Sequence, residues 1–289
     1  MTWLSWKLSE PAKRAPELPR NHDDMNGLLM TGLTDPGRLR EQNEDNIAYV
    51  PQAGLAVVAD GMGGHKAGEV ASKLAVDVIT RHIIGTLSEA GTSSDSQLES
   101  KAVSDAIQLA NRSIFELAQQ QPDYAGMGST VVVAVFHDDK LCVGHVGDSR
   151  LYRFHHGILE QITQDHSVVQ ELVNRGLATA EEARLAVNKN LVTRALGVDP
   201  NVTPDISDET VSDEDIFLLC SDGLNDVLAD GDIELMLTEH QRHLDTAAKQ
   251  MIDIANERGG PDNISVILVR ANRGFKRNQA ELRKLRDRA

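Results

Sequence analysis

The feature that most constrains the fold is an apolar run, residues 55–59, which ends in Asp60 and leads into a glycine-rich loop. A short apolar run bounded by turn residues predicts a buried strand. A carboxylate at the mouth of such a strand is costly unless a cation lies beside it. The same pattern recurs at residues 216–220, which are followed by Ser221, Asp222 and Gly223. Two buried strands that each end in an Asp-Gly pair suggest one shared metal site.

Consecutive hairpins are predicted in the middle of the chain. One tight turn lies at Asp138-Asp139 and another surrounds Gly157, each between two strand-like runs. Strands joined in this way form antiparallel sheets, not a doubly wound parallel sheet. Apolar residues at helical spacing predict two long helices, at about 68–84 and 97–120. The chain is therefore expected to be an α+β protein.

The remaining segments divide the chain into one domain, residues 27–271, and two tails. Residues 1–26 contain three prolines and scattered charge, which predicts a flexible tail. Residues 272–289 hold seven Lys/Arg against two Asp/Glu and are expected to form a basic, solvated helix without a partner. Within the domain, residues 163–197 interrupt the hairpins and are expected to form an inserted flap, with one helix at 168–175 and a short second helix at 180–186.

The charge distribution excludes some classes of function. The net charge is −15, and because the last eighteen residues carry +5, the region between the tails carries about −20. Such a surface argues against binding the backbone of DNA or RNA, but it suits carboxylates gathered around a metal ion.

The lack of an expected signal peptide or transmembrane helix favours the cytoplasm. The N-terminus has no sustained apolar segment, so no signal peptide is expected. We also expect no transmembrane helix, which needs ~18–20 apolar residues in a row. The two cysteines, Cys142 and Cys220, lie in apolar runs and are predicted to be buried thiols in a reducing compartment.

Several common catalytic motifs fail when they are tested residue by residue. The glycine-rich loop is not a Walker A loop, because Lys66 is followed by Ala67, and it is not a dinucleotide fingerprint, because position 66 is not glycine. Thiol phosphatases carry Cys-x5-Arg, but the residues six positions after the two cysteines are Asp148 and Asp226. A tight strand-to-helix turn would explain the glycines of the loop but not Asp60.

Carboxylates at strand ends or in loops remain as candidates for the chemistry. The set comprises Asp45, Asp60, Asp148, Asp222, Asp226 and Asp262. Each one alone could be a cap or a turn residue. Together they offer oxygen ligands, which favour Mg²⁺ or Mn²⁺ over zinc. Two such ions ~3.5–4 Å apart can activate a water molecule and clamp an in-line displacement at phosphorus.

An ordered set of motifs makes the prediction specific. It consists of Arg40-x4-Asp45, Asp60-Gly61-Met-Gly-Gly-His65, Gly147-Asp148-Ser-Arg150, Ser221-Asp222-Gly223 and Asp262-Asn263. In this order, over about residues 28–270, the chain resembles the bacterial branch of the metal-dependent protein phosphatases of type 2C, the PPM family. The resemblance implies a four-layer αββα sandwich, in which two central antiparallel sheets are flanked by helices, with residues 163–197 as the flap.

The resemblance also implies roles for individual residues. The two core ions would be held by Asp45, Asp60, Asp222 and Asp262, with the backbone carbonyl of Gly61 on the second ion. Glu44 would hold a metal-bound water, and Asp148 and Asp226 would bind a possible third ion. Arg40 would grip the substrate phosphate, because its planar fork matches phosphate geometry. His65 would protonate the leaving oxygen as a general acid, although a histidine here could also be a turn residue at the start of a helix.

The implied activity is Mn²⁺- or Mg²⁺-dependent hydrolysis of phosphoserine and phosphothreonine in proteins, without a phosphoenzyme intermediate. The expected protein is a cytoplasmic monomer whose partners are phosphorylated proteins and a cognate Ser/Thr kinase. Alternatives are a phosphatase dedicated to one regulatory partner, such as an anti-anti-sigma factor, and an inactive family member that acts as a binding module. A two-metal nuclease is disfavoured by the strongly acidic central region.

Overall fold

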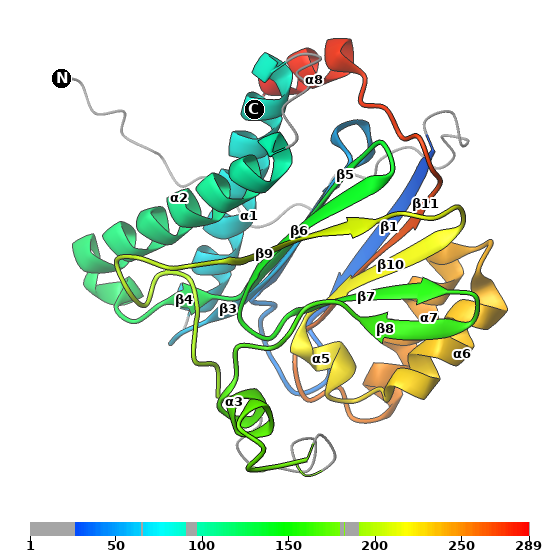
Figure 1. Ribbon diagram of the computed structural model, residues 1–289. Helices are drawn as coiled ribbons and strands as arrows, with labels where there is room; N and C mark the ends of the chain where they lie inside the picture. The colour runs from blue at the N-terminus through cyan, green and yellow to red at the C-terminus, as the bar shows by residue number, and fades with distance from the viewer. Residues whose placement is uncertain (1–26, 65, 91–96, 180–181, 183–190, 289) are drawn as a thin grey trace.

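The computed structural model describes residues 27–64, 66–90, 97–179, 182 and 191–288. It contains two antiparallel sheets, which confirms the prediction from the hairpins (Figure 1). The first sheet has the order β1 (Leu28–Asp35), β11 (Ile264–Ala271), β10 (Asp215–Cys220), β7 (Arg150–His155) and β8 (Ile158–Gln161). The second has the order β2 (Asp45–Val50), β3 (Leu55–Met62), β5 (Val131–His137), β6 (Lys140–Val146) and β9 (Asp205–Thr210), and β4 (Gly128–Ser129) pairs with the end of β3.

Helices cover the outer faces of both sheets, so that the architecture has four layers (Figure 1). The second sheet is covered by α1 (Ala67–Ala90), α2 (Leu98–Gln120) and α8 (Gln279–Arg286), and the first by α6 (Asp230–His240) and α7 (Leu244–Glu257). Shorter helices are α3 (Val168–Asn174), α5 (Asp222–Asn225) and the 3-10 turns η1 (Pro51–Ala53) and η2 (Pro122–Tyr124). The αββα sandwich implied by the resemblance is therefore confirmed.

The layered architecture explains the continuous apolar runs within β3 and β10. In β3, Leu55, Val57 and Ala59 pack under the helices, whereas Ala56 and Val58 face the other sheet. Side chains of a strand alternate between its two faces, so a strand in the middle of four layers is buried on both. In β10 the same alternation places Phe217 and Leu219 between the sheets. The continuous runs seen in the sequence are thus the two central strands that lead to the candidate site.

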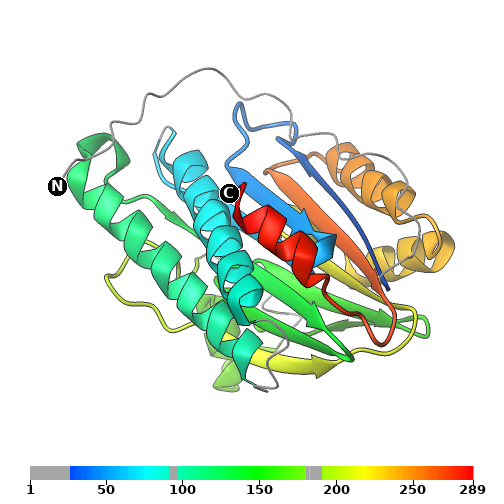
Figure 2. The same cartoon turned by 90° about the horizontal axis from the view of Figure 1, so that it is seen from above.

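The C-terminal segment differs from the prediction. It forms the expected helix, α8, but it packs against α1 instead of standing in solvent (Figure 2). Phe275 and Leu282 are fully buried. The Arg277 guanidinium donates hydrogen bonds to the carbonyl oxygens of Ala53 and Phe136 and to Glu99 Oε1, at 3.1, 2.9 and 2.7 Å. The expectation of a solvated helix is therefore wrong, whereas the absence of an external partner for this segment stays a prediction.

Some predictions lie outside the described residues, namely the N-terminal tail 1–26 and the second helix of the flap at 180–186. The first flap helix is present as α3, with Ser167 as its N-cap. Both long helices are confirmed, and α1 runs two turns further than predicted because Leu87 continues its buried face. Among the helices that the structure describes, none is long and apolar enough to cross a membrane.

Candidate metal centre

The predicted carboxylates come together at one edge of the two sheets. Asp45 begins β2 and lies opposite Asp60 of β3 in the antiparallel register. In the other sheet, Asp222 lies two residues after the end of β10. Asp262 lies just before β11, which is paired with β10. Ser221 joins the sheets, because its hydroxyl donates a 2.7 Å hydrogen bond to Asp45 Oδ2. Strands from both sheets therefore deliver their acidic ends to one place.

Two oxygen atoms in this cluster are buried without a partner. Asp45 Oδ1 and Asp222 Oδ1 have no hydrogen-bond partner among the residues that the structure describes. Buried polar atoms are nearly always paired, and an unpaired carboxylate oxygen is especially costly. Carboxylate oxygens are the ligands that Mg²⁺ and Mn²⁺ prefer. The donor set therefore fits a divalent metal centre.

The electrostatics lead to the same conclusion. Burial raises the pKa of Asp60 well above its usual range, and the negative charges of Asp45, Asp222 and Asp148 raise it further. Asp222 has its pKa raised strongly by burial and then by Asp148 and Asp226. Burial also raises the pKa of Asp45, to about 6. These carboxylates repel one another in the absence of a cation, and a bound cation would reverse that cost.

Asp148 and Asp226 lie close enough to this cluster for their charges to act on Asp222. Both charges raise the pKa of Asp222, and burial raises the pKa of Asp148 itself to about 7. The turn that carries Asp148 is closely packed: Gly147 has φ +107°, and a Cβ there would lie 2.6 Å from Thr130 Cβ. Thr130 also accepts a hydrogen bond from the Asp60 backbone through its hydroxyl. The Asp148 turn and the end of β3 are thus held by one residue.

Gly61 and Glu44 lie where β3 meets the start of α1. A Cβ on Gly61 would be 2.0 Å from the Gly68 carbonyl oxygen, so only glycine fits this close approach. A Cβ on Gly68 would be 2.6 Å from Glu44 Oε1, which places the Glu44 carboxylate over the first turn of the helix. Burial raises the pKa of Glu44. Gly61 and Gly68 therefore allow close packing of the acidic site on α1.

Arg40 lies at the rim of the cluster. Its Nη2 lies 2.9 Å from Asp262 Oδ2, and its side chain is 51% exposed. A half-exposed guanidinium beside an acidic metal centre is well placed to meet a phosphate from solvent. His65, the predicted general acid, lies outside the described residues.

Asn263 is a site residue whose role the sequence reasoning missed. Its Nδ2 donates to the carbonyl oxygens of Pro36 and Gln42, both at 2.9 Å, and its Oδ1 accepts from the Glu44 N–H at 2.8 Å. One amide thereby holds the loop that carries Arg40, Glu44 and Asp45. The only signal in the sequence was its place beside Asp262, directly before a buried strand.

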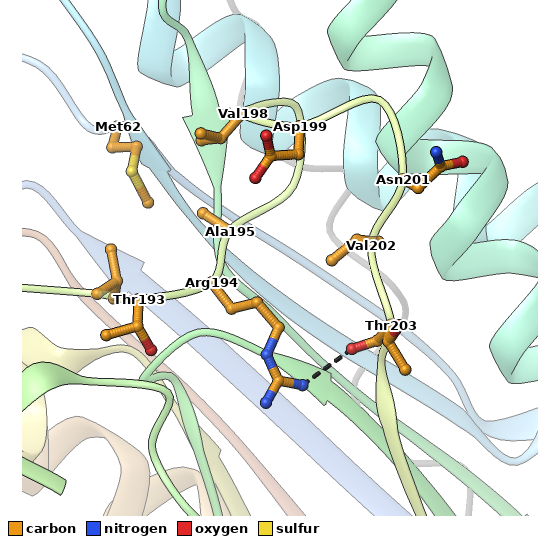
Figure 3. Close-up of a pocket in the computed structure, with 10 residues that line it drawn as sticks. Met62, Thr193, Arg194, Ala195, Val198, Asp199, Asn201, Val202 and Thr203 are labelled. Carbon is orange, nitrogen blue, oxygen red and sulfur yellow. Dashed lines mark hydrogen bonds between the residues drawn. The ribbon is translucent and has the colours of Figure 1, made fainter. Parts of the chain in front are cut away.

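A cavity of ≈ 370 Å³ lies between the end of β3 and the flap base, defined as residues 163–168 and 191–197, where the two arms of the flap meet (Figure 3). It is lined by Met62, Val192, Thr193, Arg194, Ala195, Val198, Asp199, Asn201, Val202 and Thr203. Arg194 points toward Thr203 and donates to its carbonyl oxygen at 2.9 Å. Met62 follows the predicted ligand Gly61 in the chain, but none of the predicted ligands lines this cavity.

Comparison with known proteins identifies the family. Residues 39–268 match the family model described as Protein phosphatase 2C. The chain belongs to the protein phosphatase 2C family. It is 37% identical over 246 residues to the Serine/threonine phosphatase stp of Listeria innocua, an alignment that covers 83% of this chain and 94% of the relative. It is 34% identical over 244 residues to the Protein phosphatase PhpP of Streptococcus pneumoniae, covering 83% and 96%.

Solved structures of this family share the fold. Stp1 from Staphylococcus aureus, a serine/threonine phosphatase, matches with a TM-score of 0.77 at 33% identity, covering 89% of this chain and all of that one (100%). The catalytic domain of PstP in complex with two manganese ions matches with a TM-score of 0.75 at 34% identity, covering 85% and 99%. The type 2C resemblance seen in the motifs is thereby confirmed. The roles of individual site residues stay predictions.

Proposed function

We propose that the chain is a Mn²⁺- or Mg²⁺-dependent phosphatase that hydrolyses phosphoserine and phosphothreonine in proteins. The observation that carries the proposal is the cluster of Asp45, Asp60 and Asp222, in which one buried oxygen of Asp45 and one of Asp222 lack a hydrogen-bond partner among the described residues. The family's named relatives are serine/threonine phosphatases, and one was solved with two manganese ions. A phosphate monoester needs dense positive charge, which an acidic protein supplies best through bound metal.

The residues that would hold the two core ions are Asp45, Asp60, Asp222 and Asp262, with the Gly61 carbonyl, and Asp148 and Asp226 would hold a third. When bound, the core ions activate water and stabilise charge on the phosphoryl group. Glu44, over the first turn of α1, would hold a metal-bound water. The water oxygen would form a bond to phosphorus as the bond to the seryl or threonyl oxygen breaks. The proton of the water would pass to solvent, and His65 would supply the proton that the leaving oxygen takes up.

Arg40 binds the substrate phosphate in this proposal. Its present partner, Asp262, is itself a predicted ligand, so a bound cation would compete with Arg40 for that carboxylate. The guanidinium, which is already half-exposed, is then available for two parallel hydrogen bonds to phosphate. The site thus couples metal occupancy to substrate binding through one side chain.

The proposed partners are phosphorylated proteins and a Ser/Thr kinase that supplies them, and the enzyme is proposed to act as a monomer. Cys142 and Cys220 are both buried and unpaired, which is compatible with the proposed cytoplasmic location. The alternative of an inactive binding module is disfavoured, because none of the predicted carboxylate ligands is missing from the sequence. A phosphatase dedicated to one regulatory partner would share this site and differ only in its substrate range.

The decisive experiment is hydrolysis of p-nitrophenyl phosphate and of a phosphothreonine peptide, with and without Mn²⁺. We expect activity that requires the metal and that falls by about a thousandfold in Asp222→Ala, because a lost core ion removes several kcal/mol of transition-state stabilisation. A wild-type enzyme that is inactive with Mn²⁺, or an Asp222→Ala variant with full activity, would refute the mechanism.

The role of Arg40 is tested separately. Arg40→Ala should lower kcat/KM for the phosphopeptide about ten- to a hundredfold, mainly through KM, because a charge-assisted pair to phosphate is lost. Mn²⁺ affinity should not fall. Arg258→Ala is the matched control, since Arg258 also pairs with an aspartate, Asp232, on the surface. Unchanged KM together with lost metal binding would contradict the assignment.

A further inference from the structure

His166 contacts the Asp148 turn and the flap at once. Its backbone N–H donates to the Gly147 carbonyl oxygen at 2.9 Å, and its Nδ1 accepts from the Gly147 N–H at 3.1 Å. Its own carbonyl oxygen accepts from the Thr193 N–H at 2.7 Å, on the returning arm of the flap. The side chain is only 6% exposed. Both backbone groups of the residue before Asp148 are therefore fixed by one buried histidine.

The hydrogen bond from Gly147 also fixes the protonation of the ring. A nitrogen that accepts from an N–H carries no proton, so the neutral ring bears its proton on Nε2. Burial, with His145 and Arg194 nearby, lowers the pKa of His166 to about 4, so the ring is neutral at physiological pH. Nε2 faces Asp205 Oδ2 at 3.3 Å, and Asp205 is held in turn by Arg194 at 2.6 Å. The ring thus lies between the Asp148 turn and the start of β9.

The same residues do not form a second metal site, although their spacing invites one. Ligand atoms of His145, His166 and Asp205 lie within 4.8 Å of one another. The two imidazole rings, however, are stacked at 4.5 Å with an interplanar angle of 22°, so an ion cannot lie in both ring planes. The Nε2 that an ion would need on His166 carries the proton. The cluster is better explained as a set of contacts that joins the Asp148 turn to the flap and to the start of β9.

We propose that His166 is a positioning residue that couples the flap to Asp148 and so sets the affinity of the Asp148–Asp226 pair for a divalent cation. The inference rests on the proposed function, which assigns a third ion to that pair. The flap arms are joined at His166, through its own bond to Thr193 and through the neighbouring bond from the Val168 N–H to Leu191. A shift of the flap base moves His166, loosens Gly147 and displaces the carboxylate that follows it. Coupling between sites is reciprocal, so a cation at Asp148 should in turn order the flap base.

Two substitutions separate the hydrogen bond from mere packing. The side-chain oxygen of His166→Asn can occupy the place of Nδ1 and still accept from Gly147. The longer His166→Gln places its polar group near Nε2 and leaves Gly147 without an acceptor. The two variants are therefore a matched pair, and Asp148→Ala marks the cation site itself.

The test is a calorimetric titration of the full-length protein with Mn²⁺ alone. Asp148→Ala should abolish the weakest binding event. His166→Gln should weaken that event about five- to tenfold, the effect of one lost buried hydrogen bond, whereas His166→Asn stays within about twofold of wild type. The tighter events should be unchanged in all three variants. In an Asp148→Ala background His166→Gln should have no further effect on binding, as a double-mutant cycle requires.

A second readout follows the flap directly. In wild type, Mn²⁺ at the concentration that fills the weakest site should slow hydrogen exchange at the Thr193 and Val168 amides, and this protection should be absent in Asp148→Ala. The comparison needs no His166 variant, so it decides the question even if His166→Gln does not fold. Equal exchange in both proteins overturns the coupling.

The outcomes distinguish the inference from the proposed function. If Asp148→Ala loses the weak event but His166→Gln binds like wild type, the inference fails and the proposed function stands. The same holds if His166→Asn is as impaired as His166→Gln, since then only the ring's packing matters. If Asp148→Ala binds Mn²⁺ like wild type, the third-ion assignment fails, and the inference fails with it.

Discussion

The two ends of strand β10 carry aspartates whose surroundings are opposite in kind. Asp215, at its start, is fully buried and is surrounded by partners: Arg153, His155 and the backbone N–H of Ser212. Asp222, just past its end, has burial and four other aspartates as the chief influences on its pKa, all of which raise it. One of its oxygens has no hydrogen-bond partner among the described residues.

The difference shows how a fold separates structure from function. Where a buried carboxylate only stabilises the fold, protein cations and N–H groups satisfy it, as at Asp215. Where buried carboxylates are left to repel one another, the missing charge must come from outside the chain. The arrangement at Asp222 therefore indicates a site built for cations, and that at Asp215 a purely structural ion pair.

The largest effect on stability is expected at Asp215. Asp215→Ala leaves the Arg153 guanidinium, whose side chain is 18% exposed, without its buried partner. Breaking a buried ion pair in this way costs about 3–5 kcal/mol. Urea unfolding in EDTA should show that loss, while calorimetry should show Mn²⁺ binding unchanged. A loss below about 1 kcal/mol would mean that Asp215 and Arg153 lie close together but that their pairing contributes little to stability.

Asp222→Asn should produce the opposite pattern. Removing one charge relieves repulsion, so the metal-free variant should be more stable than metal-free wild type by about 1–2 kcal/mol. Wild type should gain about 2.7 kcal/mol when Mn²⁺ is present at a hundred times its dissociation constant, and the variant should lose most of this gain. The measurement is thermal unfolding of both proteins in EDTA and in Mn²⁺. Equal stabilisation of the two proteins would refute a ligand role for Asp222.

The pH dependence of Asp45 sharpens the same point. Its pKa is raised from an ordinary 3.8 to about 6, so between these values the folded state binds more protons than the unfolded state. The contribution of Asp45 is therefore most favourable below about pH 4 and is lost as the pH rises through about 6. The stability of metal-free wild type relative to Asp45→Asn should fall by on the order of 2 kcal/mol from pH 4 to pH 7. The contribution of the histidines is the same in both proteins and cancels in the difference between their stabilities. A difference that does not change with pH would contradict the prediction.

Much of this arrangement was predictable because it is written in short stretches of sequence. The runs that end at Asp60 and Asp222 revealed both central strands, and the turn at Asp138-Asp139 revealed the antiparallel sheet. The order of the five motifs along the chain was enough to identify the family. The positions of Asp45 and Asp262 beside these strands followed from the family resemblance, since neither follows an apolar run.

The interactions that could not be predicted join residues far apart in the chain. Arg277 was expected in solvent, because nothing local shows that Ala53, Glu99 and Phe136 together satisfy its guanidinium. The hydrogen bonds of Asn263 and His166 are of the same kind, since their partners are backbone groups without a sequence signature. Such contacts depend on the final register of the strands and become visible only in the folded chain.

The smallest effect is expected where a carboxylate is paired but exposed. Lys249 and Asp253 form an i,i+4 ion pair on α7 with side chains 70% and 53% exposed. Water already solvates both charges, so Lys249→Ala should change the free energy of unfolding by no more than about 0.5 kcal/mol. Urea unfolding beside Asp215→Ala measures the contrast directly. A loss comparable to that of Asp215→Ala would show that ion pairing alone, without burial, accounts for stability at the start of β10. Burial would then not be the reason why Asp215 and Asp222 differ.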